Sequence, residues 1–317
     1  MINSILLKNS LSALAMALAL TACGGGGGGG GLSSTASSGN TLSLSQEPGA
    51  PVFTGNTAND GFNWFNFRRS QTGLSQLARN STIDSAAQGH SDYQRLNNTT
   101  THSQTVGRRG FTGVDLLSRL KFSGYEFAPR TAYAYGEVIS STGDSSGFYM
   151  AEELITAIYH RFVIMEPAFK EGGSGSAVGS DGTYYFTTDF AANNGYGLGV
   201  PSVVTYPFPN QARVSTLFYS DHESPDPVAG QNEVGYPISV HANINSTIGV
   251  NTFTVTPRGG SALQVKLLIN QTDSDTPRSA AAIIPLRILN ANTVYDVQFV
   301  GTVNGNPVTR NWSFQTK

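Results

Sequence analysis

The sequence has one cysteine and few charged residues. Cys23 is the only thiol among 317 residues, which excludes a disulfide framework and any Cys-rich zinc or iron–sulfur site. Charged residues make up 13% of the chain, where about 25% is usual. The 19 basic and 21 acidic residues leave a net charge of −2, and no basic run occurs. This balance argues against a nucleic-acid partner, which needs a concentrated cationic face, and against attachment to anionic lipid by charge alone.

Long apolar runs are also missing after the N-terminal segment. No stretch there reaches the roughly 18 residues that a membrane-spanning helix needs. Glycine and proline are plentiful instead, with 36 and 14 residues, so loops and turns take a large share of the chain. The length predicts two domains, each large enough to bury a core of its own.

The first 22 residues have the features of a signal peptide. Lys8 supplies a positive charge, and residues 11–20 form a short apolar stretch. The sequence Leu20-Thr21-Ala22-Cys23 resembles the lipobox of bacterial lipoproteins. The resemblance implies that Cys23 carries lipid, begins the mature chain and joins the protein to a membrane. The alternative is that Cys23 is an incidental or buried thiol.

A flexible tether is predicted to follow, so that residues 23–57 hold the lipidated cysteine and a linker. Gly24–Gly31 is an unbroken glycine run, and Ser, Thr and Gly dominate up to about residue 47. Such sequence cannot bury enough apolar surface to fold. Gly24 stands where aspartate, by resemblance to Gram-negative lipoproteins, favours retention in the inner membrane. We therefore expect a lipid-anchored protein of the bacterial cell envelope, at the outer membrane or cell surface.

Residues 58–200 show a mixed pattern of helices and strands. Four stretches are predicted to be helices, and in 81–96 apolar residues recur at helical spacing. Ser180-Asp181-Gly182 is a strong hairpin signal between two strands. Ser146 lies in a Gly-Asp-Ser-Ser-Gly string that superficially resembles a protease nucleophile loop, but the rest of that family's sequence is absent, so we interpret Ser146 as a helix cap. The predicted helices span 58–70, 81–96, 114–123 and 150–165, and the strands 133–139, 177–179 and 183–190.

The rest of the chain divides into a proline-rich joint at 201–234 and a β-rich segment at 235–317. Six short apolar runs without helical spacing predict a small all-β sandwich. Asn304-Gly305 is a hairpin turn between the last two runs. The end of the segment resembles bacterial Ig-like modules, a resemblance carried by Leu289, Thr293, Tyr295, Trp312, Ser313, Phe314 and Thr316.

From about residue 62 to 190, the sequence resembles the bacterial branch of the CAP superfamily (SCP-like proteins, cysteine-rich secretory proteins, antigen 5 and pathogenesis-related 1). Five short motifs occur in the family's order and spacing. They comprise Asn66, Arg69, Gly73, Leu74 and Leu77; Ala87, His90, Tyr93 and His102; Phe111, Thr112, Gly113, Arg119, Gly124 and Tyr125; Gly136, Glu137, Val138 and Ile139; and His160, Arg161, Ile164 and Met165.

The resemblance implies an α+β fold: a three-layer α-β-α CAP sandwich, followed here by the small all-β Ig-like sandwich. It also implies a cleft lined by His102, Glu137 and His160, which could hold zinc or another divalent metal. Val138 replaces the family's usual Asn, and a second cleft glutamate has no certain counterpart. The alternative is that the three residues form a buried hydrogen-bonded cluster. His90, on the apolar stripe of its helix, is predicted to be a packed core residue.

Three functions stay open at this point. The first is a non-catalytic surface lipoprotein that binds a small ligand, a lipid or a divalent metal in the His/Glu cleft, with no catalytic residue. The second is a metal-assisted hydrolase of cell-wall or extracellular peptide, in which His102 and His160 hold the ion and Glu137 is the general base or a third ligand. The third is adhesion to a protein partner through the C-terminal sandwich.

Overall fold

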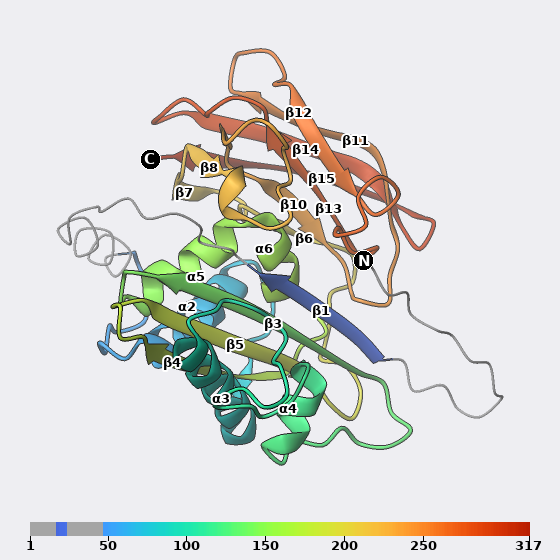
Figure 1. The fold of residues 1–317 in the computed structure, drawn as a ribbon. Helices are drawn as coiled ribbons and strands as arrows, with labels where there is room; N and C mark the ends of the chain where they lie inside the picture. Colours follow the sequence, from blue (N-terminus) through green and yellow to red (C-terminus); the bar gives the residue numbers. More distant parts are fainter. Residues whose placement is uncertain (1–16, 24–46) are drawn as a thin grey trace.

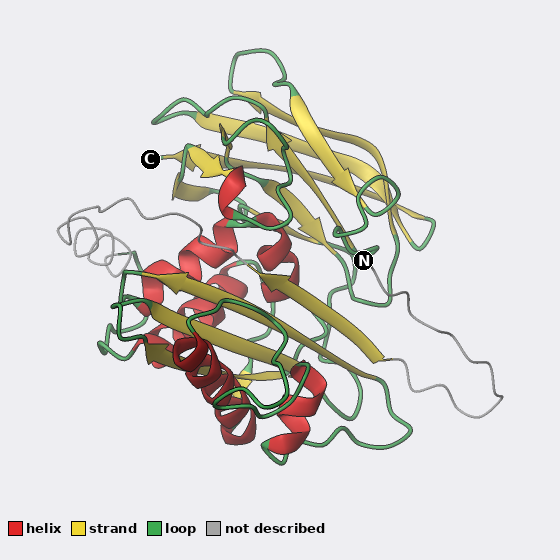
Figure 2. Ribbon diagram, viewed as in Figure 1, coloured by secondary structure: helices red, strands yellow, loops and turns green. Residues whose placement is uncertain are grey.

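The computed structural model describes residues 17–23 and 47–317, which form an α+β domain and an all-β domain (Figures 1 and 2). The predicted signal peptide up to residue 16 and the glycine-rich part of the predicted tether, 24–46, lie outside the described residues. None of the described helices is long and apolar enough to cross a membrane.

A five-stranded sheet is the middle layer of the first domain. The strand order is β1-β3-β5-β4-β2, with β3, β5 and β4 antiparallel and the edge strands β1 and β2 parallel to their neighbours. β1 falls within the predicted lipoprotein leader, and processing before Cys23 would remove all of β1 except that residue. The strands are β1 (Ala17–Cys23), β2 (Ala78–Arg79), β3 (Tyr133–Thr142), β4 (Glu171–Val178) and β5 (Tyr184–Ala192).

Helices cover both faces of this sheet, which confirms the predicted three-layer α-β-α arrangement (Figure 2). α3 (Ser81–Asn97) and α4 (Leu116–Phe122) lie on one face. α2 (Thr57–Gln71), α5 (Gly147–Thr156) and α6 (Ile158–Ile164) lie on the other.

Local sequence signals set the ends of these helices. The Asn80 side chain accepts hydrogen bonds from the N–H groups of Thr82 and Ile83 and caps α3. Ser146 accepts from the Tyr149 N–H and caps α5, as predicted. Gly124 follows α4 with φ +87°, a left-handed conformation that glycine adopts without strain.

The single helix predicted over 150–165 is wrong, because Ala157 has an extended backbone and separates α5 from α6. Nothing in the local sequence breaks a helix here. The cause is Glu223, more than 60 residues away, whose carboxylate accepts hydrogen bonds from the N–H groups of Ile158, Tyr159 and His160 at 2.8, 2.6 and 3.2 Å. These are the donors that a new helix N-terminus leaves unsatisfied.

The second domain consists of two four-stranded sheets, in the orders β12-β13-β10-β6 and β11-β14-β15-β7, and the small pair β8-β9. All six predicted strands are present, and Asn304 and Gly305 form the expected turn with positive φ. The strands are β6 (Val204–Tyr206), β7 (Gln211–Val214), β8 (Leu217–Tyr219), β9 (Glu233–Gly235), β10 (Ile238–His241), β11 (Ile248–Pro257), β12 (Val265–Ile269), β13 (Ala280–Pro285), β14 (Val294–Val303) and β15 (Asn306–Thr316).

The proline-rich joint predicted at 201–234 is part of this domain rather than a connector. β6 pairs with β10, and β7 pairs with β15, so each main sheet takes one edge strand from this segment. Pro207 follows β6 directly, a position at the end of an edge strand where a missing N–H costs no ladder hydrogen bond.

The two domains share a buried contact surface that α6 and the residues after it provide. The Arg161 guanidinium is fully buried, donates to the Pro237 carbonyl at 2.7 Å and lies over the rings of Tyr206 and Tyr236 at 4.8 and 5.0 Å. One cluster of buried apolar side chains continues from the first domain into the second. The chain is therefore built as two domains with a common core.

Candidate functional site

Glu137 is the centre of a buried polar cluster on the α4 side of the sheet. It lies in the middle of β3 and is completely buried. The Arg119 guanidinium, from α4, donates to its Oε2 at 2.5 Å. His102 Nδ1, from the loop after α3, lies 2.7 Å from Oε1. Directly opposite on β5 is Asp189, which is also fully buried.

Charge is balanced inside this cluster. Burial alone would raise the pKa of Glu137, but the Arg119 guanidinium and the neighbouring His90 and His102 rings together outweigh burial and hold that pKa well below its usual range. Burial, and then the neighbouring Glu137 carboxylate, raise the pKa of Asp189 well above its usual range. The opposite directions of the two pKa shifts favour an ionised Glu137 beside a protonated Asp189, so that a single negative charge faces the Arg119 guanidinium.

His90 closes the cluster from α3. Its Nε2 lies 2.6 Å from the Thr101 carbonyl and 4.0 Å from Glu137 Oε2, and Gln104 Nε2 lies 3.0 Å from its Nδ1. A carbonyl only accepts, so Nε2 carries the proton and Nδ1 accepts from Gln104. Burial lowers the pKa of His90 to about 4, so the ring is neutral at physiological pH. This is the packed, hydrogen-bonded core histidine that its helical position predicts.

The structure brings together two of the three predicted cleft residues, His102 and Glu137. The third, His160, lies on α6 on the opposite face of the sheet, where its Nδ1 is 3.0 Å from Glu223 Oε1. The expectation that His160 faces the same cleft fails because α6 is capped and oriented by the second domain.

The donors around Glu137 do not fit a zinc set. A catalytic zinc site needs three protein ligands and an open position. Across residues 17–23 and 47–317, no group of three His, Cys, Asp or Glu side chains could hold a metal ion. Beside Glu137, the place of a cation is taken by the Arg119 guanidinium, whose charge opposes a second cation.

Two members of the cluster were not predicted as site residues. Arg119 belongs to one of the motifs that carry the family resemblance, so a signal for it was present. For Asp189 the sequence contains a weaker signal: it is the one acidic residue within the strand Tyr184–Ala192. Its pairing with Glu137 depends on the β3–β5 register, which a single sequence does not give.

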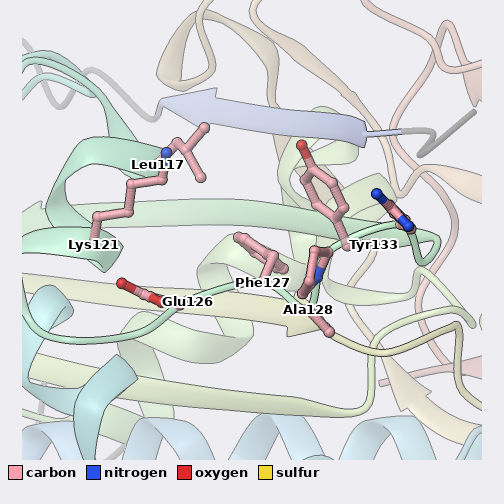
Figure 3. Close-up of a pocket in the computed structure, with 8 residues that line it drawn as sticks. Leu117, Lys121, Glu126, Phe127, Ala128 and Tyr133 are labelled. Atoms are coloured by element: carbon pink, nitrogen blue, oxygen red, sulfur yellow. The ribbon is translucent and has the colours of Figure 1, made fainter.

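A cavity lies farther along the same face of β3. Alternate residues of a strand share a face, so Tyr133, Tyr135 and Glu137 all point toward α4. The cavity has a volume of about 470 Å³ and lies between α4 and the segment 126–130 (Figure 3). Its lining includes Leu117, Lys121, Glu126, Phe127, Arg130 and Tyr133.

The three-layer fold, with Glu137 on β3 paired to His102 from the loop after α3, defines the class of the first domain. Residues 62–190 match the model of the CAP family, described as the cysteine-rich secretory protein family. This part of the chain is a CAP domain, and the all-β domain is an addition to it. No curated protein matches the sequence significantly.

Solved structures of similar proteins come from several bacteria. An extracellular protein with an SCP domain from Bacillus anthracis is 23% identical, with a TM-score of 0.36, over 43% of this chain and 40% of that one. An outer surface protein from Borrelia burgdorferi is 15% identical, with a TM-score of 0.34, over 42% and 89%. A cysteine-rich secretory protein from Staphylococcus aureus is 16% identical, with a TM-score of 0.31, over 44% and 38%. The matches thus span less than half of the Bacillus and Staphylococcus proteins.

Proposed function

We propose that this protein is a lipid-anchored CAP-domain protein of the bacterial cell envelope that binds a small ligand and catalyses no reaction. The observation that carries the non-catalytic part is the state of Glu137. Both of its oxygens are engaged, one by Arg119 and one by His102, and its low pKa makes it a weak base. A carboxylate held this way stabilises the fold and orients its neighbours.

The anchoring part rests on the sequence around Cys23. The apolar stretch, the Leu-Thr-Ala-Cys string and the glycine run behind it are the parts that a lipoprotein leader and tether need. Gly24 supports the outer membrane or cell surface as the destination. The family to which the CAP domain belongs, named for secretory proteins, agrees with export.

The rival function, a metal-assisted hydrolase, would need His102 and His160 to hold one ion beside Glu137. The pairing of His160 with Glu223 leaves that function without its second imidazole. Adhesion through the all-β domain has no particular observation in its favour.

Anchoring is tested by expressing the full chain and a Cys23→Ser variant in a Gram-negative host with labelled palmitate. We expect label and membrane fractionation for the parent, and neither for the variant. Label that persists in Cys23→Ser, or no label in either protein, would overturn the anchoring proposal.

The binding and hydrolase functions are separated by titrating zinc into the processed protein by calorimetry, with His102→Ala and His160→Ala in parallel. We expect that the parent protein has no tight one-to-one zinc site that depends on both His102 and His160. If both variants lose such a site, and if Glu137→Gln retains the metal but loses peptide hydrolysis, the hydrolase function would replace our proposal.

A further inference from the structure

We propose that the cavity between α4 and the segment 126–130 binds a small organic anion with a flat, apolar body. The proposal deepens the proposed function, because it rests on the CAP domain being a ligand-binding module. A volume of about 470 Å³ is within the range of small-molecule sites, which is roughly 300–1,000 Å³. Figure 3 shows Leu117 and Lys121 on the α4 side of this space and Phe127 and Tyr133 across from them.

Aromatic rings supply the apolar wall. Phe127 stacks on Tyr133 with ring centroids 4.5 Å apart and an interplanar angle of 27°. Tyr133 in turn stacks with Tyr135, at 6.4 Å and 13°. Phe127 and Tyr133, the two rings that line the cavity, are half-buried, so they keep surface that a ligand can cover. Such rings favour a planar partner, because a flat ligand buries apolar area against them and can take the offset-stacked or edge-to-face arrangement that their quadrupoles prefer.

The charges at the cavity favour an anion. Lys121 and Arg130 line it together with one acid, Glu126. Lys121 and Arg130 are exposed, and no described acidic side chain lies within ion-pair distance of either. A carboxylate, sulfonate or phosphate on the ligand would therefore lie near two exposed cations, while the apolar body of the ligand contacts the aromatic rings of the cavity wall.

The cavity wall is held in place before any ligand binds. Asn193, just after β5, donates to the Glu126 carbonyl at 2.9 Å and accepts from the Ala128 N–H at 2.8 Å. Thr131 Oγ1 donates to the Ala128 carbonyl at 3.0 Å. Arg130 itself has φ +60°, a left-handed backbone conformation that is uncommon for residues other than glycine and is kept only where the surrounding structure fixes it. A fixed wall lowers the ordering cost of binding.

The test measures the fluorescence of 8-anilinonaphthalene-1-sulfonate, an aromatic sulfonate, on titration with the full chain. The key variant is Arg130→Gly, because glycine accepts φ +60° and the fold is retained while the charge is lost. Arg213→Gly is the matched control, since Arg213 is a second exposed arginine with a left-handed φ of +59° and lies in β7 of the other domain. Lys121→Gln completes the set.

We expect Arg130→Gly and Lys121→Gln each to weaken probe binding several-fold, and the double variant about tenfold or more, with Arg213→Gly unchanged. Inorganic sulfate, which lacks the apolar body, should compete only weakly. Binding that is equally strong in the double variant, or equally weakened by Arg213→Gly, would overturn the proposal. The readout needs no lipid, so its failure leaves the anchoring test at Cys23 intact, and failure at Cys23 leaves this test intact.

Discussion

At the scale of single residues, the burial of the Glu137 carboxylate has to be compensated by an opposite charge. Glu137 has no exposed surface, and moving a charge out of water costs several kcal/mol unless a partner stays beside it. Arg119 is that partner, and it is also fully buried. The guanidinium satisfies Glu137 and at the same time donates to the His102 carbonyl at 2.7 Å, so it ties the loop after α3 to the sheet.

We therefore expect Arg119→Met to destabilise the protein by about 3–5 kcal/mol, because it leaves an uncompensated buried charge. The double variant Arg119→Met/Glu137→Gln should recover a substantial part of that loss. Urea unfolding followed by circular dichroism measures both. The control is Arg95→Met, which removes a half-exposed ion pair with Asp92 and should cost at most about 1 kcal/mol. An Arg119 variant as stable as the Arg95 variant would contradict this account.

The sequence alone predicts some members of the Glu137 cluster and not others. Motif spacing and family resemblance lead to His102 and Glu137, which do meet. They do not lead to Asp189, because its place opposite Glu137 depends on strand register. They misplace His160, because its orientation is decided by Glu223, in a segment with no motif.

At the scale of elements, the break between α5 and α6 shows tertiary structure overriding local preference. The stretch from Met150 to Met165 has no proline or glycine, and propensity alone favours one continuous helix. The extended backbone at Ala157 frees the first N–H groups of α6, and the Glu223 carboxylate replaces the helical acceptors that they lose.

We predict that Glu223→Ala destabilises the protein by about 2–4 kcal/mol, because it leaves buried N–H donors and His160 Nδ1 without their acceptor. Glu223→Gln keeps one carbonyl oxygen and should cost less. Unfolding in urea gives both values. Asp221→Ala, an exposed acid in the adjacent 3₁₀ turn Ser220–His222, is the matched control and should change little. If Glu223→Ala is no worse than Asp221→Ala, the cap does not maintain the break.

The longer strands of the second domain can be predicted from the sequence, whereas the short strands β6 and β7 cannot. The six runs between residues 238 and 316 alternate or cluster apolar residues over five or more positions, which identifies them without knowledge of their partners. β6 and β7 are only three and four residues long and lie close to prolines. Their strand character comes from pairing with β10 and β15, so the sequence alone indicated a joint.

At the scale of the whole molecule, the two domains are coupled through a buried acid. Glu166, two residues after α6, accepts hydrogen bonds through Oε1 from the N–H groups of Ala168 in its own domain and Ile244 in the other, at 2.9 and 3.0 Å. It is nearly fully buried. Burial outweighs these hydrogen bonds and raises the pKa of Glu166 to about 8.

This raised pKa makes the domain contact sensitive to pH. Between about pH 4.5 and pH 8, the folded chain keeps the Glu166 proton that the unfolded chain has already lost. Stability therefore falls as the pH rises through this range, by as much as about 5 kcal/mol from this group. Below pH 4.5 both states are protonated, and the penalty disappears. Glu166→Gln keeps an oxygen acceptor for the two N–H groups and does not titrate.

The loss of unfolding free energy that Glu166 causes between pH 5 and pH 8 should be absent from Glu166→Gln, a difference of several kcal/mol from the parent. We therefore expect the variant to be the more stable of the two proteins at pH 8. Urea unfolding at both pH values gives the four free energies needed. Glu233→Gln, at an exposed acid in β9, should leave the parent's pH dependence unchanged. If Glu166→Gln also leaves it unchanged, then Glu166 is ionised in the folded protein, and the contact between the domains holds a buried negative charge.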